Sequence, residues 1–144
     1  FAVIPDATLR RRFEQAMHGI VPHVNVLGLA ACEAAFRHGG DWHRELIAYL
    51  RGNRDRVAAT MASLPGVRMA PVEATYLAWI DLRPLNIDDR ALQQALIAGQ
   101  KVAIMPGYTY GPEGNGFLRL NVGCPREKLE RGVAGLIAAL RSLS

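Results

Sequence analysis

The sequence has only two cysteines, no long apolar run and no motif typical of a metal or phosphate site. Cys32 and Cys124 are too few for a disulfide framework, so a reduced, cytoplasmic setting is expected. No apolar stretch approaches the roughly 18 residues of a membrane span, which argues against a membrane protein. The histidines and cysteines lack metal-ligand spacing, and no glycine-rich loop lies between a strand and a helix. Neither a metal centre nor a phosphate-binding loop is therefore expected.

Lysine is also scarce: the 17 lysines and arginines include only two lysines, Lys101 and Lys128. The formal net charge of +4 therefore reflects an excess of arginine. Apart from the run at residues 10–12, the arginines are scattered among acidic residues. They lack the interleaved aromatic residues or the reading motif of a nucleic-acid interface. We interpret them as solvated surface rather than as a contact for nucleic acid.

The length of 144 residues, half of them hydrophobic, is sufficient for one domain with a buried core. The first five residues, FAVIP, predict the second half of a buried strand. A chain that begins inside a strand is expected to be part of a longer protein.

Three helices are predicted in the first part of the chain. Asp6 is a suitable N-cap for a short helix with apolar residues at spacing four, such as Leu9 and Phe13. An alanine-rich helix follows it. Asp41 then caps a long helix over residues 42–64, which at 1.5 Å per residue spans roughly 35 Å. A helix of this length can connect two bodies.

The remaining residues alternate between strand and helix patterns. Strands are predicted at residues 67–70, 75–82, 102–105 and 116–122, and helices at residues 88–99 and 126–143. The order β-β-α-β-β-α predicts an α/β fold with a mainly antiparallel sheet.

Arg119 is the most unusual residue of the last predicted strand, because it is a permanently charged side chain between apolar neighbours. A guanidinium held in such a place can bind a carboxylate through two parallel hydrogen bonds. The alternative is an arginine on the solvent face of an antiparallel sheet, and the strand pattern by itself favours that alternative.

Three stretches together resemble a known family. They are VPHVNVLG at residues 21–28, ATYLAWID at residues 74–81 and FLRLNVGCP at residues 117–125. They are similar to the C-terminal portion of the fold-type I pyridoxal-phosphate (PLP) enzymes, within the class I/II aminotransferase superfamily. The closest pattern is that of the cystathionine β-lyase-like C–S lyases, which share an N-x-L-G turn, a T-Y-L-A-W strand and an R-L-N-x-G-C-P ending.

This resemblance implies a division of the chain and a function. Residues 1–40 would be the tail of the large cofactor-binding domain, residues 41–64 a connecting helix, and residues 65–144 the small C-terminal domain. The chain would be a C-terminal fragment of a PLP-dependent, cytoplasmic homodimer that cleaves cystathionine-like amino acids by β-elimination. Transamination by a class I/II aminotransferase uses the same parts and stays open.

The resemblance also implies roles for particular residues. Arg119 matches the position that binds the substrate α-carboxylate, and His23 and Asn25 match a segment that approaches the active site of the neighbouring subunit. Family members hold PLP as a Schiff base on a lysine, but neither Lys101 nor Lys128 matches that lysine. The chain by itself is therefore expected to carry part of a site and to be inactive.

Two further alternatives belong to other classes. The β-β-α-β-β-α part could be a non-catalytic module that binds or senses a small carboxylate. A nucleic-acid binder would instead show steeply salt-dependent retention on DNA.

Overall fold

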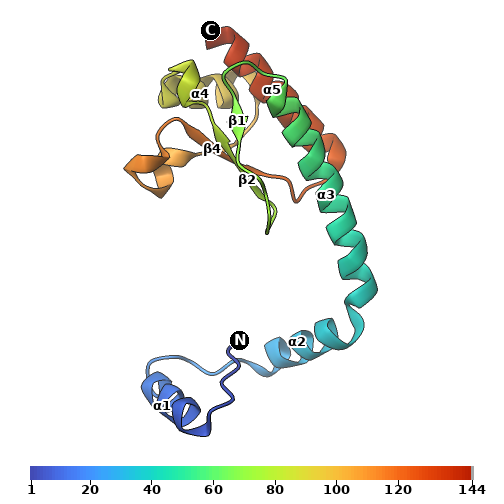
Figure 1. Ribbon diagram of the computed structural model, residues 1–144, viewed down its shortest axis with the longest axis vertical. Coiled ribbons are helices and arrows are strands. Elements are labelled where there is room, and N and C mark those ends of the chain that lie inside the picture. Colours follow the sequence, from blue (N-terminus) through green and yellow to red (C-terminus); the bar gives the residue numbers. More distant parts are fainter. Residues whose placement is uncertain (144) are drawn as a thin grey trace. The chain divides into compact units, whose positions relative to one another are not determined.

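The computed structural model describes residues 1–143 and divides the chain into two units, Phe1–His43 and Arg44–Ser144 (Figure 1). The first unit contains α1 (Ala7–Met17) and α2 (Val26–His38). As predicted, Asp6 caps α1, because its carboxylate accepts a hydrogen bond from the Leu9 amide at 2.6 Å. Asn25 caps α2 in the same way. No residue of either helix is buried.

The strand predicted for residues 1–5 is wrong. These residues form no regular element, and most of them are exposed. A strand needs a neighbouring strand to satisfy its backbone groups, and no described strand pairs with this segment. The Phe1 ring instead contacts the Phe36 ring edge-on, with centroids 5.7 Å apart.

The long helix α3 covers Gly40–Ala62, close to the predicted residues 42–64. Its buried side chains, Asn53, Val57 and Met61, recur every four residues and therefore lie on one face of the helix. This face packs in the second unit, where Val57 and Met61 join the hydrophobic core.

The second unit is built on a four-stranded antiparallel sheet, which confirms the predicted α/β fold. Its strands are β1 (Arg68–Met69), β2 (Leu77–Asp81), β3 (Met105–Pro106) and β4 (Phe117–Asn121), in the order β1-β2-β4-β3. Between β2 and β3 lie a 3-10 turn (Arg83–Leu85) and α4 (Asp89–Gln94), which continues as a π-helix (Ala95–Gly99). Two 3-10 turns, Gly107–Tyr110 and Pro112–Gly114, precede β4, and α5 (Arg126–Leu143) follows it.

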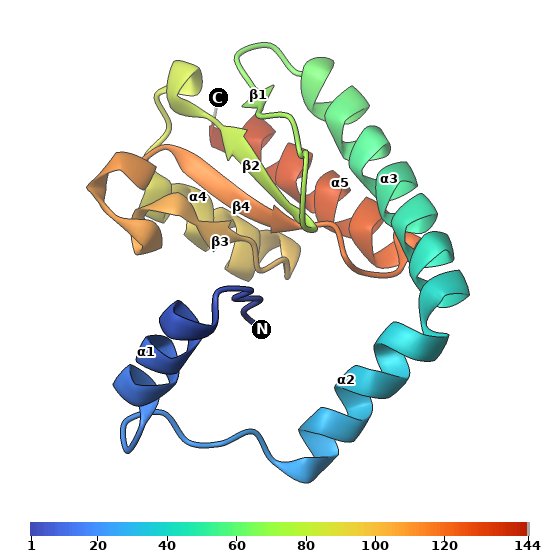
Figure 2. The same ribbon diagram turned by 60° about the horizontal axis from the view of Figure 1, so that its bottom comes forward.

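One face of the sheet is covered by helices and the other is not. Ala78, Ile80 and Leu118 are fully buried and pack with residues of α3, α4 and α5 in a single core. Figure 2 shows α4 and α5 on the same side of the sheet. Side chains alternate along a strand, so Trp79 and Arg119 project from the opposite face, where they are only partly buried. None of the helices within residues 1–143 is both long and apolar enough to span a bilayer.

Candidate functional site

Arg119 occupies the middle of β4, with a strand on each side. Its backbone lies opposite Trp79 of β2 and opposite Met105 of β3. The antiparallel register therefore places these three side chains together on the face without helices. Arg119 is partly buried there, whereas Met105 is 46% exposed.

The Arg119 guanidinium lies over an aromatic ring and not beside a carboxylate. Its Cζ is 4.5 Å from the centroid of the Tyr110 ring, within the usual range of a cation–π contact. Its Nε is shielded from solvent and has no hydrogen-bond acceptor among residues 1–143. A buried donor without an acceptor is unfavourable, so an acceptor that approached this guanidinium would stabilise it.

The Tyr110 ring is one end of a column of side chains that crosses the open face. Trp79 contacts Tyr110 edge-on at a centroid distance of 6.0 Å and stacks on Phe117 at 5.3 Å. The Arg83 guanidinium covers the other side of the column, with its Cζ 4.5 Å from the Phe117 ring. We call these residues, Arg83, Phe117, Trp79, Tyr110 and Arg119, the aromatic column.

An ion pair holds the far end of the column. Arg83 donates from Nε to Asp81 Oδ1 and from one Nη to Asp81 Oδ2, both at 2.9 Å. The Arg83 backbone amide donates to the same carboxylate at 3.0 Å. The side-chain hydrogen bond from Arg83 is the main cause that lowers the pKa of Asp81 below its ordinary value, against the opposing effect of burial. The same bond raises the pKa of Arg83.

A tight loop positions Tyr110. A side chain at Gly107 would place its Cβ only 2.2 Å from the Gly114 carbonyl oxygen, and one at Gly114 would meet the Gly107 carbonyl oxygen at 2.1 Å. The two 3-10 turns therefore touch backbone to backbone, which only glycine allows. The Thr109 hydroxyl also donates to the Pro106 carbonyl at 2.7 Å. The turn that carries Tyr110 is thus tied to the end of β3.

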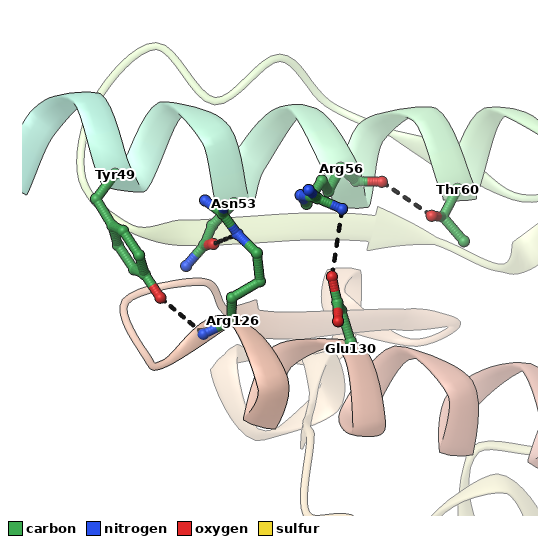
Figure 3. Close-up of polar contacts among 6 residues, drawn as sticks. All are labelled: Tyr49, Asn53, Arg56, Thr60, Arg126 and Glu130. Carbon is green, nitrogen blue, oxygen red and sulfur yellow. Dashed lines mark hydrogen bonds and ion pairs between the residues drawn. The ribbon is translucent and has the colours of Figure 1, made fainter.

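The C-terminal end of the Arg119 strand is anchored to α3 (Figure 3). Asn53 is fully buried, and its amide donates to the carbonyls of Val122 and Cys124 at 2.9 and 3.0 Å. Its oxygen accepts from Arg126 Nε at 3.2 Å. The Tyr49 hydroxyl accepts from the Arg126 backbone amide at 2.7 Å. These bonds attach the turn between β4 and α5 to the long helix.

Arg119 also lines a cavity of about 620 Å³ between the segment leading into β3, the end of β4 and the start of α5. The charged residues on its wall are Lys101, Arg119, Lys128 and Arg131, and no acidic residue lines it. Walls of one charge sign attract ligands of the other sign. The cavity therefore favours an anion.

The other predicted site residues lie in the first unit. His23 is exposed and precedes α2, and Asn25 is exposed and caps α2, with its oxygen accepting from the Gly28 amide at 2.8 Å. Both remain predicted cofactor contacts. Both lysines lie on the cavity wall. Lys101 has a left-handed backbone, with φ of 55°, and donates to the Ala98 carbonyl at 3.0 Å.

Tyr110 is the residue that sequence reasoning missed. The sequence placed it in a loop, and no local pattern links it to Arg119, because a cation–π contact has no fixed sequence spacing. Within residues 1–143 no group of three or more histidine, cysteine or acidic residues could hold a metal ion.

Comparisons with known proteins identify the family of this chain. The family model described as aminotransferase class I and II matches residues 4–136. Protein MalY of Escherichia coli strain K12 is 50% identical over 99% of this chain and 37% of its own length. Cystathionine beta-lyase PatB of Bacillus subtilis strain 168 is 37% identical over 96% of this chain and 36% of its own length.

A solved structure shares the fold. The crystal structure of cystalysin from Treponema denticola, which contains a pyridoxal 5'-phosphate cofactor, superposes with a TM-score of 0.84 at 28% identity. The superposition covers 99% of this chain and 36% of cystalysin. The chain thus spans a little over a third of the length of these relatives. With the family model matching nearly all of its residues, the chain belongs to the aminotransferase class I and II family.

Proposed function

We propose that this chain provides the carboxylate-binding arginine of a PLP-dependent C–S lyase that acts on cystathionine-like amino acids. The observation that carries the proposal is the state of Arg119. The residue is partly buried, its guanidinium lies over the Tyr110 ring, and it has no carboxylate partner within residues 1–143. It lines a cavity whose charged residues are all basic. An unpaired guanidinium in such a place is suited to an anionic ligand.

The named functions of the relatives support the choice of a lyase. PatB is a cystathionine beta-lyase, and cystalysin contains the PLP cofactor. Relatives named as LL-diaminopimelate aminotransferases match at only 24–25% identity. Transamination is therefore the second candidate.

Arg119 would bind and orient the substrate rather than exchange protons. A guanidinium stays protonated throughout the physiological range, so it cannot serve as the catalytic base. Two parallel hydrogen bonds to the α-carboxylate would fix the orientation of the substrate Cα. In β-elimination from cystathionine the Cα–H and Cβ–S bonds break and a thiol leaves. PLP, when bound, supplies an electron-accepting ring for this chemistry.

His23 and Asn25 are suited to contact the cofactor rather than to carry it. Both side chains are exposed, and the Asn25 oxygen is already used to cap α2, which leaves its NH₂ group to donate. We propose that they approach PLP in the neighbouring subunit of a cytoplasmic homodimer. We also propose that neither Lys101 nor Lys128 carries the cofactor.

The test is steady-state kinetics of the PLP-loaded full-length protein that contains these residues. Removing one partner of a desolvated charge pair costs about 2–5 kcal/mol. Arg119→Ala is therefore expected to lower kcat/KM for cystathionine by roughly 30- to 4,000-fold at ~1.4 kcal/mol per decade. Arg119→Lys should recover only part of this loss, because an ammonium cannot reproduce the planar fork. PLP absorbance should persist in both variants.

Arg141→Ala is the matched control, because Arg141 is an exposed arginine near the end of α5. It should leave kcat/KM unchanged. Near-normal kcat/KM in Arg119→Ala would overturn the proposed role. The products decide the reaction type: a thiol, pyruvate and ammonia indicate β-elimination, whereas a keto acid formed without thiol release indicates transamination. Carboxylate binding without any PLP would indicate the non-catalytic module.

A further inference from the structure

We propose that Tyr110 is a positioning residue for Arg119. Its ring holds the guanidinium plane so that the edge of the guanidinium stays available to the substrate carboxylate. This inference rests on the proposed function, because it takes Arg119 as the carboxylate-binding residue.

The first argument is geometric. The Arg119 Cζ lies over the Tyr110 ring at 4.5 Å from its centroid, so the ring occupies one side of the guanidinium. A guanidinium donates its hydrogen bonds in its own plane. The ring occupies one side only, so the N–H donors that point away from it stay available to an acceptor. The two interactions are compatible, and the same guanidinium can make both at once.

The second argument concerns competing partners. Among residues 1–143 no carboxylate forms an ion pair with Arg119, and its Nε has no acceptor. Within residues 1–143, the contact with Tyr110 is thus the interaction that holds the Arg119 side chain in place across the sheet face. An arginine that is already ordered loses less conformational freedom when it binds a ligand. Removal of the ring should therefore weaken substrate binding.

The third argument is that Tyr110 is itself held in place. Trp79 contacts it edge-on, and the loop that carries it is closed by the Gly107–Gly114 backbone contact. The Tyr110 hydroxyl has no hydrogen-bond partner in the described part of the chain, and the residue is 48% exposed. The ring rather than the hydroxyl is therefore the part that acts on Arg119. Tyr110→Phe should therefore keep the contact with Arg119, and Tyr110→Leu should remove it.

The experiment uses the PLP-loaded full-length protein with Tyr110→Leu, Tyr110→Phe and the matched control Tyr108→Leu. Tyr108 lies in the same 3-10 turn and is 39% exposed, but within residues 1–143 it makes no ring or cation–π contact. The measurements are kcat and KM for cystathionine and the inhibition constant of L-alanine, an amino acid without a leaving group. Tyr110→Leu is expected to raise KM and the inhibition constant by about 2- to 30-fold, the range of a cation–π contact, with little change in kcat.

Tyr110→Phe keeps the ring and should behave like the unmodified protein, as should Tyr108→Leu. In an Arg119→Ala background, Tyr110→Leu should have no further effect on either constant, because Tyr110 acts through Arg119. If Tyr110→Leu does not fold, pentafluorophenylalanine at position 110 gives an isosteric ring with the opposite face charge. This ring should raise both constants, whereas phenylalanine should not.

The outcomes separate this inference from the proposed function. If Arg119→Ala impairs binding but Tyr110→Leu and the pentafluoro ring do not, Tyr110 has no positioning role and the inference is overturned alone. Equal impairment in Tyr110→Phe and Tyr110→Leu would assign the effect to the hydroxyl and would also overturn it. If Arg119→Ala itself leaves binding unchanged, the proposed function fails first.

Discussion

Two polar side chains of the second unit carry buried hydrogen-bond donors, and only one of them has acceptors in the described structure. Asn53 is fully buried and makes three hydrogen bonds, to the carbonyls of Val122 and Cys124 and with Arg126. Arg119 has a shielded Nε without an acceptor in the described structure. Buried donors in folded proteins are normally satisfied. Arg119 Nε shares this unsatisfied state with Gln93 Nε2. We assign a ligand role to Arg119 because it also lines the basic cavity, whereas Asn53 has a structural role.

A pH-dependent prediction concerns Asp81 and its ion pair with Arg83. The pKa of Asp81 is lowered from its ordinary value of 3.8 in the folded protein, chiefly by the hydrogen bond from Arg83. Such a carboxylate stabilises the fold at pH above its unfolded pKa, and this contribution is lost as pH falls through the lower folded pKa. Asp81→Asn should therefore reduce the free energy of unfolding at pH 7, and the difference should begin to shrink below about pH 4 and disappear once the pH is below the lowered folded pKa of Asp81.

Urea unfolding of both proteins between about pH 2 and pH 7 measures this difference. Glu113→Gln is a suitable control, because Glu113 is an exposed acid in the loop between β3 and β4. A deficit of Asp81→Asn that stayed constant across this range would contradict the role assigned to ionisation.

At the scale of elements, the loop between β3 and β4 depends on two glycines in contact. Gly114→Ala would place a methyl group 2.1 Å from the Gly107 carbonyl oxygen, so the backbone must move. We expect the free energy of unfolding to fall by about 1–3 kcal/mol. KM for the substrate should rise as well, because the same loop carries Tyr110.

Gly132→Ala in α5 is the matched comparison. A Cβ at Gly132 meets nothing within 4 Å, and the position is helical. Alanine should therefore stabilise the protein by about 0.4–1 kcal/mol. Urea unfolding of the two variants should give changes of opposite sign. A Gly114→Ala variant as stable as the starting protein would contradict the steric argument.

The helix that follows β2 shows how tertiary contacts alter an element without replacing it. The sequence predicted one helix over residues 88–99, and the structure has α4 continuing as the π-helix Ala95–Gly99. The predicted strand at residues 102–105 is reduced to Met105–Pro106. The Val102 amide donates to the Leu96 carbonyl at 3.0 Å instead of to a strand. The end of the helix therefore uses a backbone group that the strand pattern had assigned to the sheet.

For the whole molecule, burial is distributed very unequally between the two units. Among residues 1–143, every buried hydrophobic residue lies at or beyond Val57, in the unit Arg44–Ser144. The exposed large hydrophobic residues of the first unit include Phe1, Val3, Leu9, Phe13, Ile20, Val24, Val26, Leu27, Leu29 and Phe36. Apolar surface of this extent drives association.

We therefore expect the 144-residue chain to form dimers or larger species through residues 1–40. Sedimentation velocity across a range of protein concentrations measures this association. A variant lacking residues 1–43 is the control. It should be monomeric and should unfold cooperatively, because it retains the sheet and the whole buried core. A monomeric full chain, or a shortened chain that does not fold, would contradict this account.

The sequence by itself determined the element order and the outlines of the α/β fold. The long helix was predicted over residues 42–64 and lies at Gly40–Ala62, and the strand of Arg119 was predicted over residues 116–122 and lies at Phe117–Asn121. Both follow from the spacing of apolar side chains, which depends only on the local geometry of helices and strands. The strand predicted at residues 1–5 failed because a strand also needs a partner, and local spacing contains no information about partners.

The tertiary structure alone decided what surrounds Arg119. The sequence marked this residue as a candidate, but the strand pattern by itself favoured a solvent-exposed arginine. Strand pairing placed Trp79 and Met105 beside it, and the glycine-closed loop brought Tyr110 to its guanidinium. These contacts join residues from separate segments of the chain, so no repeating sequence spacing predicts them. They form because burying one face of the sheet under α3, α4 and α5 leaves the other face to hold the aromatic column.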